Sequence, residues 1–217
     1  MLISIFSLRF RAAAVLVLAV VFWSQPSHSV FPQAATQTHR RAVDRQVLTS
    51  TYLPAIRIRF DRKFNYVGTQ RFVLYERAQA DQFFFVDADN RGRIRRMYLV
   101  QFEGYLPGVD AAYDYPATQT VTLAGQTYLV NAETVLNVSD VIKQNPQSDT
   151  ARAAAFLQSK GLRISDSIRF QRFVRLVDDA KRNELLLIYV EDATAPAAQD
   201  KLGKEFLARA MQGFTIL

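Results

Sequence analysis

The chain has 217 residues, of which 49% are hydrophobic and 22% are charged, and its formal net charge is +7 at pH 7. These fractions are typical of a globular protein and argue against long disorder. The absence of cysteine excludes disulfides, thiol nucleophiles and thiolate metal sites.

The N-terminal residues follow the pattern of a secretory signal peptide. Arg9 and Arg11 precede an uninterrupted apolar run over residues 12–23, and small residues lead to Ser29. The pattern predicts that residues 1–29 are a signal peptide, and hence that the protein is periplasmic or extracellular. The alternative is an uncleaved membrane anchor. Twelve helical residues span only roughly 18 Å, which is too short to cross a membrane, but the apolar residues before Arg9 could lengthen the helix.

We predict residues 30–50 to be a flexible leader and residues 51–217 to form one domain. Apolar and polar residues then alternate in several segments with the two-residue period of a strand. A hairpin is expected around Ala124 and Gly125. The other predicted strands cover residues 56–60, 70–77, 82–86, 94–105, 167–177 and 184–190.

Helices are expected in three places. A short helix should end before Pro146, and a second should begin at Ser148 or Asp149 and end before Gly161. An amphipathic helix is expected within residues 200–214. The order of elements predicts an α+β fold, a mainly antiparallel sheet of about six to eight strands with two or three helices packed on it.

The end of the chain has an order of elements that we can compare with a known family. An apolar strand, "ELLLIYV", leads through a loop to an amphipathic helix and a closing "GFTIL". Residues 184–217 thereby resemble the end of PsbP-like domains. The resemblance implies an α/β sandwich with helices on the sheet and a non-enzymatic accessory role, and it implies no functional residue.

One segment has part of the spacing of a calcium-binding loop. Asp87, Asp89 and Gly92 would occupy positions 1, 3 and 6. However, position 5 is Arg91, which repels a cation, and position 12 is Tyr98, which offers no carboxylate. Because Asp and Gly also favour tight turns, the segment predicts a hairpin connection and no metal site.

Arginines recur on the predicted strands, and tyrosines recur in the long loop over residues 106–119. If the strands are neighbours, the arginines could form a basic stripe that binds phosphate or sulfate groups; otherwise they are the solvated side of a half-exposed sheet. The candidate binding residues are Arg57, Arg59, Arg95, Arg96, Arg169, Arg172, Arg175, Tyr105, Tyr113 and Tyr115.

The expected function is therefore binding by an exported, non-enzymatic domain without a cofactor. Its partner would be an envelope protein, an anionic lipid or a polyanionic glycan, and export argues against nucleic acid. Membrane contact is expected only through an uncleaved signal segment.

Two alternatives stay open. The many phenylalanines could line a cavity for an apolar ligand, although such residues more often fill a core. Asp110 and Asp114, which share a loop with three tyrosines, could be the acids of a hydrolase. A Ser-His-Asp triad is implausible because the two histidines, His28 and His39, lie in the predicted signal and leader.

Overall fold

Two antiparallel sheets and three helices make up the described part of the computed structural model, residues 40–115, 119–194 and 203–217. The arrangement is a single α+β domain, as predicted. The two sheets together have eleven strands, more than the six to eight expected. The additional strands are mostly short ones, which contain too few apolar residues to show a period.

The larger sheet has seven strands in the order β4-β5-β6-β10-β9-β8-β7. Its strands are β4 (Asn65–Leu74), β5 (Ala78–Ala88), β6 (Ile94–Tyr105), β7 (Gln119–Leu123), β8 (Gln126–Val135), β9 (Ile168–Leu176) and β10 (Asn183–Asp192). The predicted hairpin joins β7 to β8, with positive φ at Ala124 and Gly125. The central strands β6 and β10 place apolar side chains on both faces of the sheet.

The smaller sheet has four strands in the order β1-β2-β3-β11. Its strands are β1 (Arg41–Asp44), β2 (Val47–Thr51), β3 (Ala55–Phe60) and β11 (Phe214–Ile216). The prediction of a flexible leader over residues 30–50 is therefore wrong from residue 41 onward. Leu48 is fully buried there and fixes the β1–β2 hairpin against the core.

The three helices are α1 (Val138–Gln144), α2 (Asp149–Ser159) and α3 (Lys204–Gln212). All three correspond to predicted helices, and Ser148 caps α2 by accepting a hydrogen bond from the backbone N of Ala151 at 3.1 Å. Residues 200–202 of the third prediction lie outside the described residues. None of the helices in the described ranges has the length and apolar character needed to cross a membrane, and the predicted signal lies outside those ranges.

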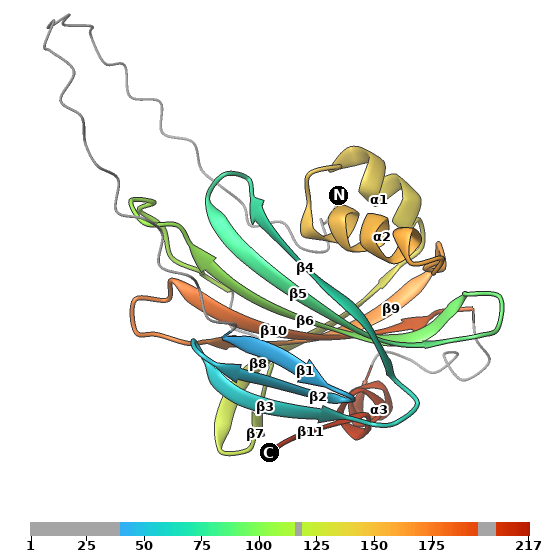
Figure 1. Ribbon diagram of the computed structural model, residues 1–217, viewed down its shortest axis with the longest axis horizontal. Helices are drawn as coiled ribbons and strands as arrows, with labels where there is room; N and C mark the ends of the chain where they lie inside the picture. Colours follow the sequence, from blue (N-terminus) through green and yellow to red (C-terminus); the bar gives the residue numbers. More distant parts are fainter. Residues whose placement is uncertain (1–39, 116–118, 195–202) are drawn as a thin grey trace, which may run out of the picture.

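The sheets and helices enclose two cores. The smaller sheet and α3 pack on one face of the larger sheet, where Phe85, Tyr98 and Phe206 are completely buried. Helices α1 and α2 cover part of the other face, where Phe84 and Leu157 are completely buried (Figure 1). The phenylalanines thus fill cores, and the polar residues of the helix-covered face are left to form the site described next.

Candidate functional site

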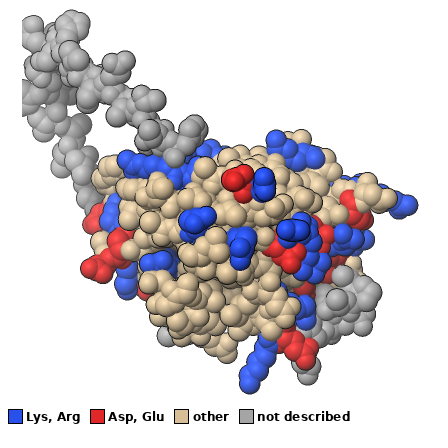
Figure 2. All heavy atoms as spheres, turned by 60° about the horizontal axis from the view of Figure 1, so that its bottom comes forward, with Lys and Arg blue, Asp and Glu red and all other residues tan. Residues whose placement is uncertain are grey.

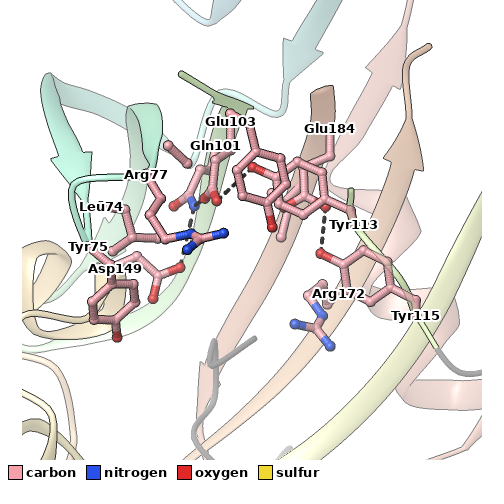
Figure 3. Close-up of a pocket in the computed structure, with 13 residues that line it drawn as sticks. Leu74, Tyr75, Arg77, Gln101, Glu103, Tyr113, Tyr115, Asp149, Arg172 and Glu184 are labelled. Atoms are coloured by element: carbon pink, nitrogen blue, oxygen red, sulfur yellow. Dashed lines mark hydrogen bonds between the residues drawn. The ribbon is translucent and has the colours of Figure 1, made fainter. Parts of the chain in front are cut away.

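A small cavity lies where the helix-covered face of the larger sheet meets the loop after β6 and the start of α2. Its volume is about 40 Å³. Its wall has three carboxyl groups, from Glu103, Asp149 and Glu184, and two guanidinium groups, from Arg77 and Arg172. The tyrosines of the wall are Tyr75, Tyr105, Tyr113 and Tyr115 (Figure 3). If all these charged groups were ionised, the acids would exceed the bases by one.

Strand pairing places two of the acids opposite each other. Glu103 of β6 and Glu184 of β10 are direct partners in the antiparallel register. Opposite residues in such a pair have Cβ atoms about 5 Å apart and side chains on the same face, so two negative charges there repel each other. Asp149, the first residue of α2, also lines the cavity, from the helix that covers this face.

Tyrosine hydroxyls donate hydrogen bonds to both glutamates. Tyr113 donates to Glu103 Oε1 at 2.9 Å, and Tyr115 donates to Glu184 Oε2 at 2.5 Å. The rings of Tyr105 and Tyr113 stack with centroids 4.5 Å apart, which encloses the cavity on the loop side. The loop thus supplies a hydrogen-bond donor to each carboxyl group but no positive charge.

Arg182, in the turn before β10, holds this loop in place. Its guanidinium donates to the carbonyl oxygens of Val109 at 2.6 Å, Ala111 at 3.1 Å and Leu106 at 3.1 Å. The backbone N of Tyr113 also donates to the carbonyl oxygen of Lys181, at 2.8 Å. These bonds fix the positions of the tyrosines relative to the sheet.

A row of glutamine side chains leads from the sheet edge to the cavity. Gln70 donates to Gln82, and Gln82 donates to Gln101, at 2.7 and 2.6 Å. Gln101 then donates to Glu103 Oε2 at 2.5 Å and to Asp149 Oδ2 at 3.4 Å. Such a chain satisfies buried polar atoms and fixes their orientation.

Burial raises the pKa of all three acids. Loss of solvation is the largest cause at Glu103, Asp149 and Glu184. The charge of Glu103 is the next largest cause at the other two acids, and it acts in the same direction. Arg172 lowers these pKa values less, and its Nε already donates to Asn131 Oδ1 at 2.9 Å. The charged forms of these acids are therefore incompletely balanced by the protein itself.

The structure brings together four of the predicted binding residues. Tyr105, Tyr113, Tyr115 and Arg172 all line the cavity, and the guanidinium of Arg172 lies 5.6 Å from the ring centroid of Tyr115. They meet because Tyr115 of the loop after β6 binds Glu184 near the start of β10 and lies close to Arg172 of β9. The sequence showed the tyrosines as a cluster, but it did not show which strand they face.

The other six predicted arginines do not lie at the cavity. Arg57 and Arg59 are exposed on β3 of the smaller sheet. The remaining four lie on the larger sheet: Arg95 and Arg96 bind Asp87, Arg169 is buried 3.8 Å from Glu191, and Arg175 is half-buried. Figure 2 shows basic side chains in several separate groups, some of them beside acidic ones. These arginines therefore do not form a single stripe across one sheet.

The calcium-like spacing belongs to the hairpin between β5 and β6, as predicted. Asp89 Oδ1 accepts hydrogen bonds from the backbone N of Arg91 at 2.8 Å and of Arg93 at 3.0 Å. Asp87 instead accepts from two arginine side chains. Within residues 40–115, 119–194 and 203–217, no group of three or more histidine, aspartate or glutamate side chains is placed to hold a metal ion.

The acids proposed for hydrolysis are not the ones at the cavity. Asp110 and Asp114 are exposed and do not line it. The sequence analysis did not identify Glu103, Asp149 and Glu184, the acids that line the cavity, because an acid at the end of a strand or the start of a helix has an ordinary structural explanation. One signal was available: Glu184 begins an otherwise apolar strand, "ELLLIYV", so an acid there has neighbours that are buried.

Comparisons with known proteins add no assignment. No protein-family model, curated protein or solved structure matches the chain. The resemblance of residues 184–217 to PsbP-like domains remains an expectation from the sequence alone, and the functional argument rests on the cavity.

Proposed function

We propose that this chain is an exported, non-enzymatic binding domain and that the cavity binds a primary ammonium group. The facing pair of Glu103, which is half-buried, and Glu184, which is buried, is the observation on which the proposal depends. Among the described residues, both accept hydrogen bonds from neutral donors, the tyrosine hydroxyls and Gln101. A cation between them would supply the charge that the protein leaves unbalanced. The export part of the proposal rests on the basic and apolar pattern of residues 9–29.

The size and chemistry of the cavity favour an ammonium over other cations. A volume of about 40 Å³ accommodates a group of about the size of water. An ammonium is compact and has three donors, whereas a guanidinium is a broad planar fork. The tyrosine rings add aromatic faces, which attract cations. The carboxylates and rings together therefore fit a primary amine.

Contact with an envelope component through the arginines is the weaker proposal. It requires the arginines on one exposed face, whereas Arg169 is buried and Arg95 and Arg96 both pair with Asp87, which offsets one of their two charges. The apolar-carrier alternative has less support, since many of the phenylalanines, among them Phe83, Phe84 and Phe170, are buried in the two cores.

Calorimetric titration with ethanolamine tests the proposal, with ethylene glycol as the uncharged control of similar size. We expect the wild type to bind ethanolamine, and Glu184→Gln and Glu103→Gln to weaken that binding by about tenfold or more, because a charge-assisted hydrogen bond is lost. Asp110→Asn and Asp114→Asn remove acids of the nearby loop that lie outside the cavity, and they should leave the affinity unchanged. Equal binding of the two compounds, or no effect of either glutamate substitution, would refute the proposal.

Binding should also depend on pH. Because burial raises the pKa of the glutamates, they hold their protons to higher pH than exposed glutamates do, and an ammonium must displace those protons. The affinity should therefore rise as pH increases through the raised pKa values, and complex formation should release protons. Titration in two buffers with different ionisation enthalpies measures that release.

A second candidate is a carboxylate hydrolase that uses Glu103 and Glu184. Glycoside cleavage generally uses two neighbouring carboxyl groups, one of which has a raised pKa and donates a proton, and Glu103 and Glu184 are neighbours whose pKa burial raises. The small cavity favours binding over this reaction, because a sugar ring is much larger than a water molecule. Release of nitrophenol from aryl glycosides by the wild type, and not by Glu184→Gln, would favour the hydrolase.

A further inference from the structure

A groove separate from the cavity lies on the other face of the larger sheet. Its volume is about 360 Å³, within the usual range of roughly 300–1,000 Å³ for small-molecule sites. Side chains alternate along β6, so the carboxyl group of Glu103 lies with Gln101 on the helix-covered face, whereas Phe102 packs in the core beneath the smaller sheet. Asp81, the partner of Phe102 in the pairing of β5 with β6, lines the groove on that second face.

One part of the groove wall is the turn after β2, which Arg41 holds in place. Its guanidinium donates to the carbonyl oxygens of Tyr52 at 3.2 Å and Leu53 at 3.0 Å. It also donates to Asp81 at 2.6 Å, and this ion pair balances the charge of Arg41. The ring of Tyr52 in turn lies against the guanidinium of Arg40, 4.1 Å from the ring centroid, in a cation–π contact. The turn thus supports Arg40 at the groove.

Arg40 is the charge that the groove leaves unbalanced. Among the described residues, no acid forms an ion pair with Arg40. Two acids line the groove, but Asp81 is paired with Arg41, and the carboxyl group of Glu103 is bonded on the other face of the sheet. A guanidinium is a planar fork of donors that matches a carboxylate, and one positive charge balances one carboxylate.

The floor of the groove is polar but adds no charge. Gly104 and Asn183 are direct partners in the pairing of β6 with β10, and the Asn183 side chain occupies the space that a Cβ on residue 104 would need. Asn183 donates to Asp178 at 2.7 Å, and Gln79 donates to the carbonyl oxygen of Phe72 at 2.8 Å. These amide donors are therefore already bonded within the protein.

A second part of the wall is apolar. Leu106 and Pro107, at the start of the loop after β6, line the groove together with Leu53 of the turn after β2. Arg182 holds this loop too, by donating to the carbonyl oxygen of Leu106 at 3.1 Å. Apolar surface of this kind gains from contact with the hydrocarbon part of a ligand.

We infer that the groove binds a short-chain carboxylic acid, with its carboxylate at Arg40 and its hydrocarbon chain against Leu53, Leu106 and Pro107. The site is independent of the proposed ammonium cavity, since it lies on the other face of the sheet and takes a ligand of opposite charge. Because hydrogen bonds hold both the turn after β2 and the loop after β6, little order has to be imposed when the ligand binds.

Hexanoate is the probe, with hexanol as its uncharged analogue and acetate as the acid without a chain. We expect the wild type to bind hexanoate about tenfold more tightly than hexanol in calorimetric titration, because hexanol lacks the charged hydrogen bond. Arg40→Gln should abolish this preference. Arg57→Gln removes the same charge from an exposed position on β3 that does not line the groove, and it should preserve the preference.

The hydrocarbon chain is tested separately. Hexanoate should bind about tenfold more tightly than acetate, because its chain buries apolar surface. Leu106→Ala keeps the carbonyl oxygen that Arg182 binds, and it should weaken the binding of hexanoate without changing that of acetate. Equal affinities for the two acids, or an unchanged hexanoate affinity in Leu106→Ala, would overturn the assignment of the apolar wall.

The outcomes are distinct from those of the ammonium proposal. Equal binding of hexanoate and hexanol, or an unchanged preference in Arg40→Gln, would overturn the carboxylate site. Loss of the preference in Arg57→Gln would also overturn it, since overall charge would then explain the effect. Glu184→Gln, which alters the ammonium cavity, should leave the hexanoate affinity unchanged, and a loss of hexanoate binding there would contradict the independence of the two sites.

Discussion

Two sets of acids in the larger sheet differ in the side chains that donate hydrogen bonds to them. Asp81 and Asp87 each accept hydrogen bonds from two arginines. Glu103 and Glu184, in the same sheet, accept from tyrosine hydroxyls and a glutamine. Asp81, Asp87 and Glu184 are buried and Glu103 is half-buried, so the two sets differ mainly in whether their hydrogen-bond donors carry a charge. Asp81 and Asp87 join parts of the fold through their arginine partners. Glu103 and Glu184 have negative charges that their hydrogen-bond donors do not balance, which suits them to binding a cation.

The strongest test of this comparison is Asp81→Asn. Asp81 links β5 to Arg41 on β1, and the Arg41 side chain is only 14% exposed. Its removal should lower the free energy of unfolding by about 3 kcal/mol, because a mostly buried guanidinium would lose its counter-charge. Urea unfolding measures this, with exposed Asp110→Asn as the control. A loss below about 1 kcal/mol would show that Arg41 is sufficiently stabilised by its carbonyl acceptors and by water.

Arg182→Ala should have the next largest effect. Its guanidinium binds three carbonyl oxygens of the tyrosine loop, and hydrogen bonds to charged groups are among the stronger ones. We expect a loss of about 2 kcal/mol in unfolding free energy, together with weaker amine binding as the tyrosines lose their positions. Arg182→Lys keeps the charge and should recover part of both quantities. Unchanged near-ultraviolet circular dichroism of the tyrosines in Arg182→Ala would contradict this role.

Glu184→Gln should stabilise the protein without ligand. A raised pKa means that the folded protein retains a proton that the unfolded chain releases, so the stability is present near pH 4 and is lost as pH rises through the folded pKa. Glutamine avoids that loss and still accepts from Tyr115. We expect a gain of about 1 kcal/mol at pH 8 and none at pH 4. Thermal unfolding at both pH values measures it, and a destabilised variant at pH 8 would mean that the charge is already balanced.

Asp87→Asn should show the opposite dependence on pH. Its arginine partners hold the pKa of Asp87 below its usual value against the effect of burial, so its contribution is present above about pH 4 and is lost as pH falls through the folded pKa. Arg95 and Arg96 are 59% and 37% exposed, so the loss at pH 7 should be only about 0.5–1 kcal/mol. Unfolding measured from pH 7 to pH 2 should show the difference disappear; parallel curves would contradict it.

The elements with strong local signals were predictable from the sequence. The cap at Ser148, the turn at Ala124 and Gly125 and the turn after Asp87 all depend on neighbouring residues, and the structure confirms each one. The β1–β2 hairpin was missed because its stability comes from packing Leu48 into a core that the local sequence does not reveal. Part of the site was predictable in the same way, since two tyrosines in one long loop and Tyr105 just before it were named as candidate binding residues.

The sequence by itself determined the α+β class, the helices and the alternation that builds the strands, because these depend on contacts within a few residues. Only the tertiary structure decided which charges meet. Glu103 and Glu184 are 81 positions apart and become neighbours through the pairing of β6 with β10, whereas the arginines expected in one stripe are divided between two sheets. Strand order and register set the distances between charges, and those distances follow from the packing of the whole domain.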